Sequence, residues 1–186
     1  MAGKTLVCLA IVGALLGSIP AQASYRGTLR HHTETGRIYK LNTLDSVLLW
    51  NATYYSAAFR RAFEKKHARI KYLDPLETAL FVAQEEAKQE KNHEFFVGLF
   101  TQNEFREFST DRNSFWQVVL TAENGMEMAP DSVAMVPVGP YERKMFPYLN
   151  RWSQAYRVTF PKAELGKHFT LTLRSIEGSS TLKWDN

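Results

Sequence analysis

The chain has 186 residues, of which 13% are aromatic and 23% charged, and its formal net charge is +4. The aromatic content is higher than in disordered chains, so we expect a folded core. A domain of this length buries enough surface to be stable without disulfide bonds. The small positive charge bears on solubility and non-specific association and indicates no fold.

The first 23 residues have the three-part layout of a secretory signal peptide. Lys4 provides a positive start, residues 6–17 form an apolar run, and Ala21 and Ala23 are small residues before a cleavage site. This run is shorter than the roughly 20 apolar residues of a membrane-spanning helix. We expect cleavage after Ala23, with an uncleaved anchor as the alternative, and export to the periplasm or the cell exterior.

The only cysteine, Cys8, is removed with the signal peptide. The mature chain then has no thiol, which excludes disulfides, a thiol nucleophile, thiolate zinc sites and iron–sulfur clusters. Loss of Lys4 lowers the formal net charge to +3. A thiol-free exported chain is typical of a bacterial envelope protein. We expect residues 24–186 to form a single domain.

Two kinds of element are predicted in the first part of the mature chain. Residues 25–41 indicate a hairpin, with Gly36 suited to its turn. Residues 44–70 have helical periodicity, and Asn42 or Thr43 can cap the helix. The apolar face of this predicted helix contains Leu44, Leu48, Tyr55, Phe59 and Ala62.

A second helix is predicted from Asp74 to about residue 92. Asp74 can cap it, Pro75 suits its first position, and Glu77 completes a capping box. The short connection at residues 72–73 favours a helical hairpin with the preceding helix. The predicted apolar stripe consists of Leu76, Ala79, Leu80, Ala83 and Ala87.

The remaining chain carries strand patterns. Residues 93–101 are apolar on both faces, which is typical of a central strand, and residues 168–184 favour an antiparallel hairpin. Further strands are predicted at residues 115–121, 133–138 and 155–160, and an irregular segment at residues 124–152. The sequence therefore predicts an α+β fold. An N-terminal hairpin and a two-helix segment (about 43–92) pack on a mainly antiparallel β-sheet or sandwich (about 93–186).

The common catalytic signatures are not in the sequence. It contains no Gly-x-Ser-x-Gly elbow, no His-Glu-x-x-His pair, no phosphate-binding glycine loop and no dinucleotide fingerprint. This speaks against the common hydrolases and nucleotide-dependent enzymes. The alternative is a metal-dependent or histidine/acid hydrolase of the envelope, with a site assembled from distant residues. Its candidate residues are His31, His32, Glu34, His93 and His168.

Two sets of residues have metal-ligand character. In an extended segment His32 and Glu34 share one face while His31 lies on the other, which is too few ligands for a structural site. Glu86, Glu90 and His93 would share a helix face, but di-iron sites take ligands from four helices. A solvated turn and a solvated helix end are the simpler interpretations. We therefore expect no metal and no cofactor.

A basic stripe is the strongest binding feature. Arg61, Lys65 and Arg69 recur every four residues on the first predicted helix and can attract an anionic surface. The alternative is a solvated face near the helix C-terminus, where cations meet the negative end of the helix dipole. The aromatic segment at residues 141–152 offers Tyr148 and Trp152 for contact with a protein or glycan, or as lids on the β-core.

These features favour a non-enzymatic accessory or binding protein of the cell envelope. It would act through the basic helix face of Arg61, Lys65 and Arg69 and the aromatic segment with Tyr148 and Trp152. The expected partner is an envelope protein or an anionic envelope component, including a membrane surface. Nucleic acid is not an expected partner because the protein is predicted to leave the cytoplasm.

Overall fold

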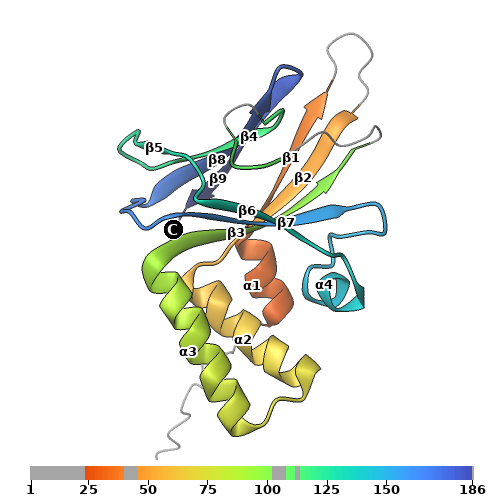
Figure 1. The fold of residues 1–186 in the computed structure, drawn as a ribbon, viewed down its shortest axis with the longest axis vertical. Helices are drawn as coiled ribbons and strands as arrows, with labels where there is room; N and C mark the ends of the chain where they lie inside the picture. The colour runs from red at the N-terminus through yellow and green to blue at the C-terminus, as the bar shows by residue number, and fades with distance from the viewer. Residues whose placement is uncertain (1–23, 40–45, 102–107, 112–113, 186) are drawn as a thin grey trace, which may run out of the picture.

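The fold has three layers. The computed structural model describes residues 24–39, 46–101, 108–111 and 114–185. A four-stranded sheet stacks on a five-stranded sheet, whose outer face is covered by helices (Figure 1). The predicted α+β class with mainly antiparallel sheets is confirmed. The predicted signal peptide (residues 1–23) and the predicted caps Asn42 and Thr43 lie outside the described residues.

The larger sheet has β3 at its centre and antiparallel neighbours throughout. In spatial order its strands are β1 (Thr33–Tyr39), β2 (Ser46–Tyr54), β3 (Asn92–Phe100), β7 (Gln154–Pro161) and β6 (Ser132–Val136). β3 is buried on both faces because helices cover one side and the second sheet covers the other. The prediction of a central strand here is confirmed.

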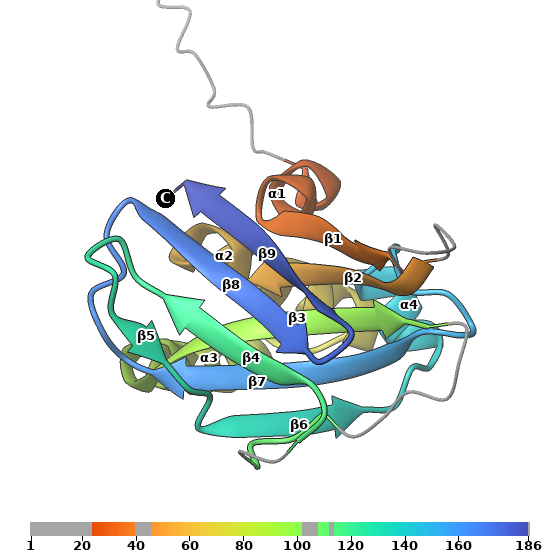
Figure 2. The same cartoon turned by 90° about the horizontal axis from the view of Figure 1, so that it is seen from above.

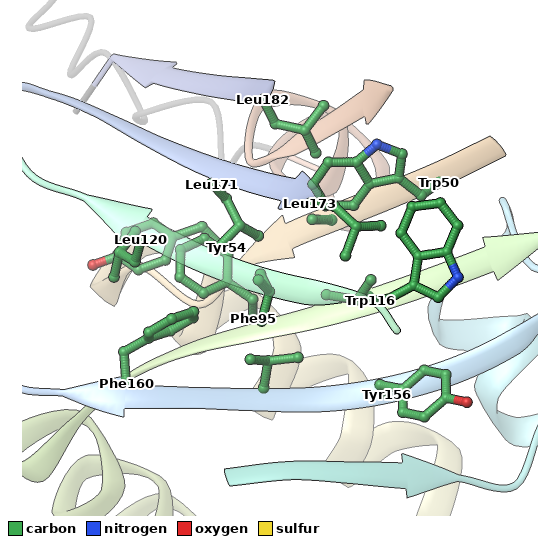
Figure 3. Packing of buried hydrophobic residues seen from close by; sticks show 14 of the residues in the cluster. Trp50, Tyr54, Phe95, Trp116, Leu120, Tyr156, Phe160, Leu171, Leu173 and Leu182 are labelled. Atoms are coloured by element: carbon green, nitrogen blue, oxygen red, sulfur yellow. The ribbon is translucent and has the colours of Figure 1, made fainter. Parts of the chain in front are cut away.

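The smaller sheet is also antiparallel. Its strands, in spatial order, are β5 (Glu127–Met128), β4 (Gln117–Thr121), β8 (His168–Ser175) and β9 (Gly178–Asp185). The predicted hairpin at residues 168–184 is confirmed as β8 and β9. The large apolar side chains between the two sheets interlock as in a sandwich core, with Trp50 and Phe95 opposite Leu171 and Leu173 (Figure 3).

The two sheets meet most closely where β1 lies beside β9 (Figure 2). A Cβ atom at Gly36 would lie 2.3 Å from Trp50 Nε1 and 2.5 Å from Ser180 Oγ. Trp50 Nε1 donates a hydrogen bond to Ser180 Oγ at 3.0 Å. Glycine at position 36 therefore allows β1 and β9 to approach each other closely. Gly36 was predicted to lie in a turn, but it lies within β1.

Four helices form the outer layer of the described structure: α1 (Tyr25–His31), α2 (Ala57–Lys71), α3 (Pro75–Lys91) and α4 (Pro140–Met145). A second apolar core joins them to the sheet. In this core Phe96 of β3 stacks on Phe146 at a centroid distance of 3.8 Å, and Phe59 and Phe63 of α2 pack nearby. No helix in these described ranges is both long enough and apolar enough to cross a membrane.

The predicted hairpin at residues 25–41 is wrong in its first half. The chain forms α1 there, and Ser24 caps the helix by accepting a hydrogen bond from the Gly27 N–H. The N-terminal hairpin instead pairs β1 with β2. Residues 25–31 contain few apolar side chains, so the sequence pattern gave little sign of a helix.

The predicted helix at residues 44–70 is wrong from Ser46 to Ser56, and its first two residues, including Leu44, lie outside the described residues. Residues 46–54 form β2, and α2 begins only after Ser56, whose Oγ accepts a hydrogen bond from the Phe59 N–H. The reason is a two-residue alternation that the helical interpretation overlooked. Leu48, Trp50, Ala52 and Tyr54 all belong to the sandwich core.

The predicted second helix is confirmed as α3, with the Asp74–Glu77 capping box and the helical hairpin with α2. Its predicted apolar stripe does not face the core. Leu76 and Leu80 are 69% and 58% exposed, and the three alanines of the stripe are exposed as well. Phe81 and Glu85 face α2 instead, because Phe81 stacks on a ring of α2 and Glu85 forms ion pairs.

The strands predicted near residues 115–121, 133–138 and 155–160 are confirmed as β4, β6 and β7. The segment at residues 124–152, predicted to be irregular, contains β5, β6 and α4. Its Met145, Phe146 and Leu149 belong to the core beneath the helices.

Candidate functional site

A groove of about 670 Å³ lies between α1, α2 and the C-terminal end of α4. It is lined by Ser24, Tyr25, Arg26, Ala62, Lys65, Lys66, Arg69, Ile70, Tyr72 and Lys144. Five of these ten side chains are cationic, and none is acidic. We call this feature the basic groove.

Contacts among the three helices bring the cations of the basic groove together. Lys66 Nζ donates a hydrogen bond to the Lys144 carbonyl oxygen at 2.8 Å and lies 4.0 Å from the ring centroid of Tyr25. Tyr25 Oη in turn donates to the Met145 carbonyl oxygen at 2.9 Å. α1 and α4 are thereby tied to α2, which places Arg26 and Lys144 beside the basic run of α2.

The positive charge of the basic groove is not neutralised by any acidic residue that the structure describes. None of its five cations forms an ion pair with a described residue. Burial lowers the pKa of Lys66, and the neighbouring charges of Arg26 and Lys144 lower it further. Like charges held this close repel each other, so an anion bound among them would relieve the repulsion.

Tyr72 adds an exposed aromatic ring at the mouth of the basic groove. It ends α2 in a left-handed conformation, with φ of 54°, and its side chain is 92% exposed. Tyrosine combines an apolar ring with a polar hydroxyl, a combination suited to the boundary between water and an apolar phase.

The predicted basic stripe is only partly gathered in this groove. Lys65 and Arg69 line it, whereas Arg61 lines a separate groove of about 430 Å³ between α2 and α3. That second groove also contains Glu64, Glu86 and Glu90, so its charge is mixed. Arg61 is separated from Lys65 and Arg69 because it lies on the side of α2 nearer to α3, where Glu86 and Glu90 of α3 line the same groove.

The two predicted aromatic binding residues lie elsewhere. Tyr148 and Thr53 share a hydrogen bond of 2.9 Å between their hydroxyl oxygens, and the Tyr148 ring lines a narrow cleft beside Leu149. Trp152 is 66% exposed, with the Arg151 guanidinium 4.8 Å from its ring centroid. Neither lines the basic groove.

The candidate histidines do not form a metal centre within the part of the chain that the structure describes. His31 and His32 have ring centroids 5.0 Å apart at the end of α1, and His32 hydrogen-bonds Ser56 Oγ. Glu34 lies on β1. His168 Nδ1 lies 2.7 Å from an Asp185 carboxylate oxygen in an exposed pair.

The predicted shared face of Glu86, Glu90 and His93 is wrong because α3 ends at Lys91. His93 instead belongs to β3 and is buried. Its Nδ1 lies 3.1 Å from the Tyr54 hydroxyl oxygen, and its Nε2 lies 2.8 Å from the Ala163 carbonyl oxygen. His93 is therefore a hydrogen-bonded core residue.

A buried charge cluster between the helices and the sheet was not predicted from the sequence. Arg60 of α2 ion-pairs with Glu85 of α3 at 2.5 Å and with Glu94 of β3 at 3.0 Å. Lys88 and Arg157 complete the cluster by pairing with Glu85 and Glu94, respectively. The three central side chains are at most 3% exposed, so the cluster fixes the helical hairpin on the sheet.

Glu64 lies one turn after Arg60 on α2. Burial, together with the negative charge of Glu85, raises the pKa of Glu64 to about 6. No described histidine, serine or threonine hydrogen-bonds this carboxyl group. The raised pKa therefore reflects its position beside the buried charge cluster.

Comparison of the chain with protein-family models, with curated proteins and with solved structures found no match. What the protein does is therefore inferred from its own residues and their geometry.

Proposed function

We propose that this is an exported, non-enzymatic binding protein of the cell envelope, and that its basic groove holds a phosphate-bearing anionic component of the envelope. The observation that carries the proposal is the gathering of Arg26, Lys65, Lys66, Arg69 and Lys144 around one groove with no acidic side chain among them.

The residue types in the groove suit phosphate oxygens. Lysine binds phosphate as a point charge, and arginine donates two parallel hydrogen bonds. A basic residue close to an anionic membrane contributes about 1 kcal/mol to binding, and this contribution weakens as salt screens the charges. Five such residues therefore support attachment that is strong at low salt and reversible at high salt.

The exposed aromatic ring of Tyr72 at the mouth of the groove favours a lipid surface as the source of the phosphate. Leu76 and Leu80, which follow Tyr72 on the first two turns of α3, are exposed as well. Tyr72 can reach the headgroup region while the cations bind phosphates. The hydrolase alternative has no supporting observation of this kind among the described residues.

The test neutralises three groove cations with Lys65→Gln, Arg69→Gln and Lys144→Gln in one protein. Partitioning onto phosphatidylglycerol-containing vesicles is measured by co-sedimentation at low salt. Because about 3 kcal/mol of attraction is lost, we expect the partition coefficient to fall about 100-fold. A second arm titrates inorganic polyphosphate, which separates recognition of a lipid surface from recognition of phosphate alone.

The matched control removes the same charge elsewhere, with Lys91→Gln, Lys167→Gln and Lys183→Gln at exposed positions. We expect this variant to retain most of the vesicle binding of the unmodified protein. Equal losses in the two variants would mean that net charge alone governs binding, and the groove would then have no specific role.

A further inference from the structure

A further cleft, of about 180 Å³, is lined by residues of α2, α3, α4 and the outer face of the five-stranded sheet. Its apolar walls include the rings of Phe63, Phe81, Phe96 and Phe146, and its polar lining includes Tyr55 and Arg157. We call it the aromatic cleft. It shares no lining residue with the basic groove.

Tyr55 brings an unused hydroxyl group to the aromatic cleft. Its side chain is only 3% exposed, yet its hydroxyl oxygen has no hydrogen-bond partner among the described residues. Burial raises the pKa of Tyr55 well above its ordinary value, so the group remains a neutral donor. A buried hydroxyl without a partner is costly, and a ligand that accepts its hydrogen bond would remove this cost.

Arg157 brings further unused donors. It projects from β7, and its Nε lies 3.2 Å from Glu94 Oε1, while its terminal nitrogens have no partner among the described residues. The Arg157 side chain is 35% exposed and lines the cleft. A guanidinium group has five N–H donors in a planar fork that matches a carboxylate.

The acidic residues near the aromatic cleft are already engaged. Glu85, which lines the cleft, pairs with Arg60 and Lys88. Glu94 pairs with Arg60 and Arg157; its buried Oε1 accepts no hydrogen bond from a described residue, but Glu94 does not line the cleft. Glu142 Oε2 accepts a hydrogen bond from the Gly139 N–H at the start of α4. Within the cleft lining, the spare hydrogen-bonding groups of Tyr55 and Arg157 are donors, which favours a ligand that supplies acceptors.

We propose that the aromatic cleft binds a small monocarboxylate with an apolar body. The carboxylate accepts hydrogen bonds from Arg157 and the Tyr55 hydroxyl, and the body lies against the phenylalanine rings. The cleft has a volume of about 180 Å³. It is smaller than the roughly 300–1,000 Å³ of sites for drug-sized ligands, so the ligand is no larger than a benzoate.

Benzoate is the probe for the test, and binding is measured by calorimetry and by NMR chemical shifts. Tyr55→Phe removes only the hydroxyl oxygen. We expect this variant to bind benzoate at least tenfold more weakly than the unmodified protein. The ligand-free variant should unfold at the same or a higher denaturant concentration, because an unpaired buried hydroxyl contributes nothing to stability.

Tyr148→Phe is the matched control, because its hydroxyl is hydrogen-bonded to Thr53 and it does not line the aromatic cleft. This variant should retain benzoate affinity and lose some stability. The proposal is overturned if benzoate does not bind, if Tyr55→Phe binds it equally well, or if neutral benzamide binds as tightly. A less stable ligand-free Tyr55→Phe would also overturn it, since the hydroxyl would then hold structural water.

Discussion

Replacing Arg60 with alanine should lower the free energy of unfolding by about 3–5 kcal/mol. Arg60 is 1% exposed and is the cation shared by Glu85 and Glu94, which are themselves 2% and 3% exposed. Without it, both carboxylates keep only one cation each, Lys88 and Arg157, and those two side chains are 46% and 35% exposed. Two poorly neutralised carboxylates would then lie in the interface between the helices and the sheet.

Urea denaturation followed by circular dichroism measures this loss. Arg61→Ala is the matched control, because Arg61 is exposed on the next position of α2 and should change stability by no more than about 0.5 kcal/mol. A triple variant with Arg60→Met, Glu85→Gln and Glu94→Gln should regain much of the stability, since it removes the three central charges of the cluster together. If Arg60→Ala is no less stable than Arg61→Ala, the cluster does not hold the layers together.

Replacing Trp50 with alanine should cost about 3–5 kcal/mol. The Trp50 side chain is fully buried between the two sheets, and its Nε1 donates to Ser180 Oγ of β9. The substitution opens a cavity at the point where β1 approaches β9, and it also leaves Gly36 without its closest neighbour. Gly36 has no side chain to fill that space, so we expect little collapse into it.

The control for Trp50→Ala is Trp152→Ala, which removes a side chain that is 66% exposed. Trp152→Ala should change the free energy of unfolding by no more than about 0.5 kcal/mol. Both values come from guanidinium denaturation at a fixed pH. Similar losses for the two variants would contradict the placement of Trp50 in the sandwich core.

The β-rich half could be predicted from the sequence because its strands carry simple patterns. In β8 the buried Phe169, Leu171 and Leu173 alternate with less buried residues, which is the two-residue period of a half-buried strand. β3 is apolar on both faces because it is covered on both. The α3 start was equally clear, since Asp74, Pro75 and Glu77 form a local capping signal.

The N-terminal half could not be predicted as well, because competing periods overlap there. Leu48 and Tyr55 are seven residues apart, which fits a helix, whereas Leu48, Trp50 and Ala52 fit a strand. Tertiary pairing with β1 and β3 decides in favour of the strand. On α3 the apolar stripe predicted the wrong buried face. The buried face contains the charged residue Glu85, which its ion pairs with Arg60 and Lys88 stabilise there.

Only part of the candidate site could be predicted from the sequence, because tertiary packing brings its other residues together. Lys65 and Arg69 stood out because they are close in sequence and recur on one helix face. Arg26 and Lys144 join them only through the packing of α1 and α4 on α2, at a separation of more than a hundred residues between the two. Tyr55 and Arg157 gave no sequence signal, since an unused hydrogen-bond donor is a property of the fold.

Amide chemical-shift mapping with phosphatidylglycerol nanodiscs tests the central claim most directly, because it locates the binding surface residue by residue. At low salt we expect the shifts to concentrate on the residues of the basic groove, at 24–26, 62–72 and 144, and to fade as salt is raised. Shifts centred on Trp152 or the four-stranded sheet, or no shifts at low salt, would contradict the proposed role of the groove.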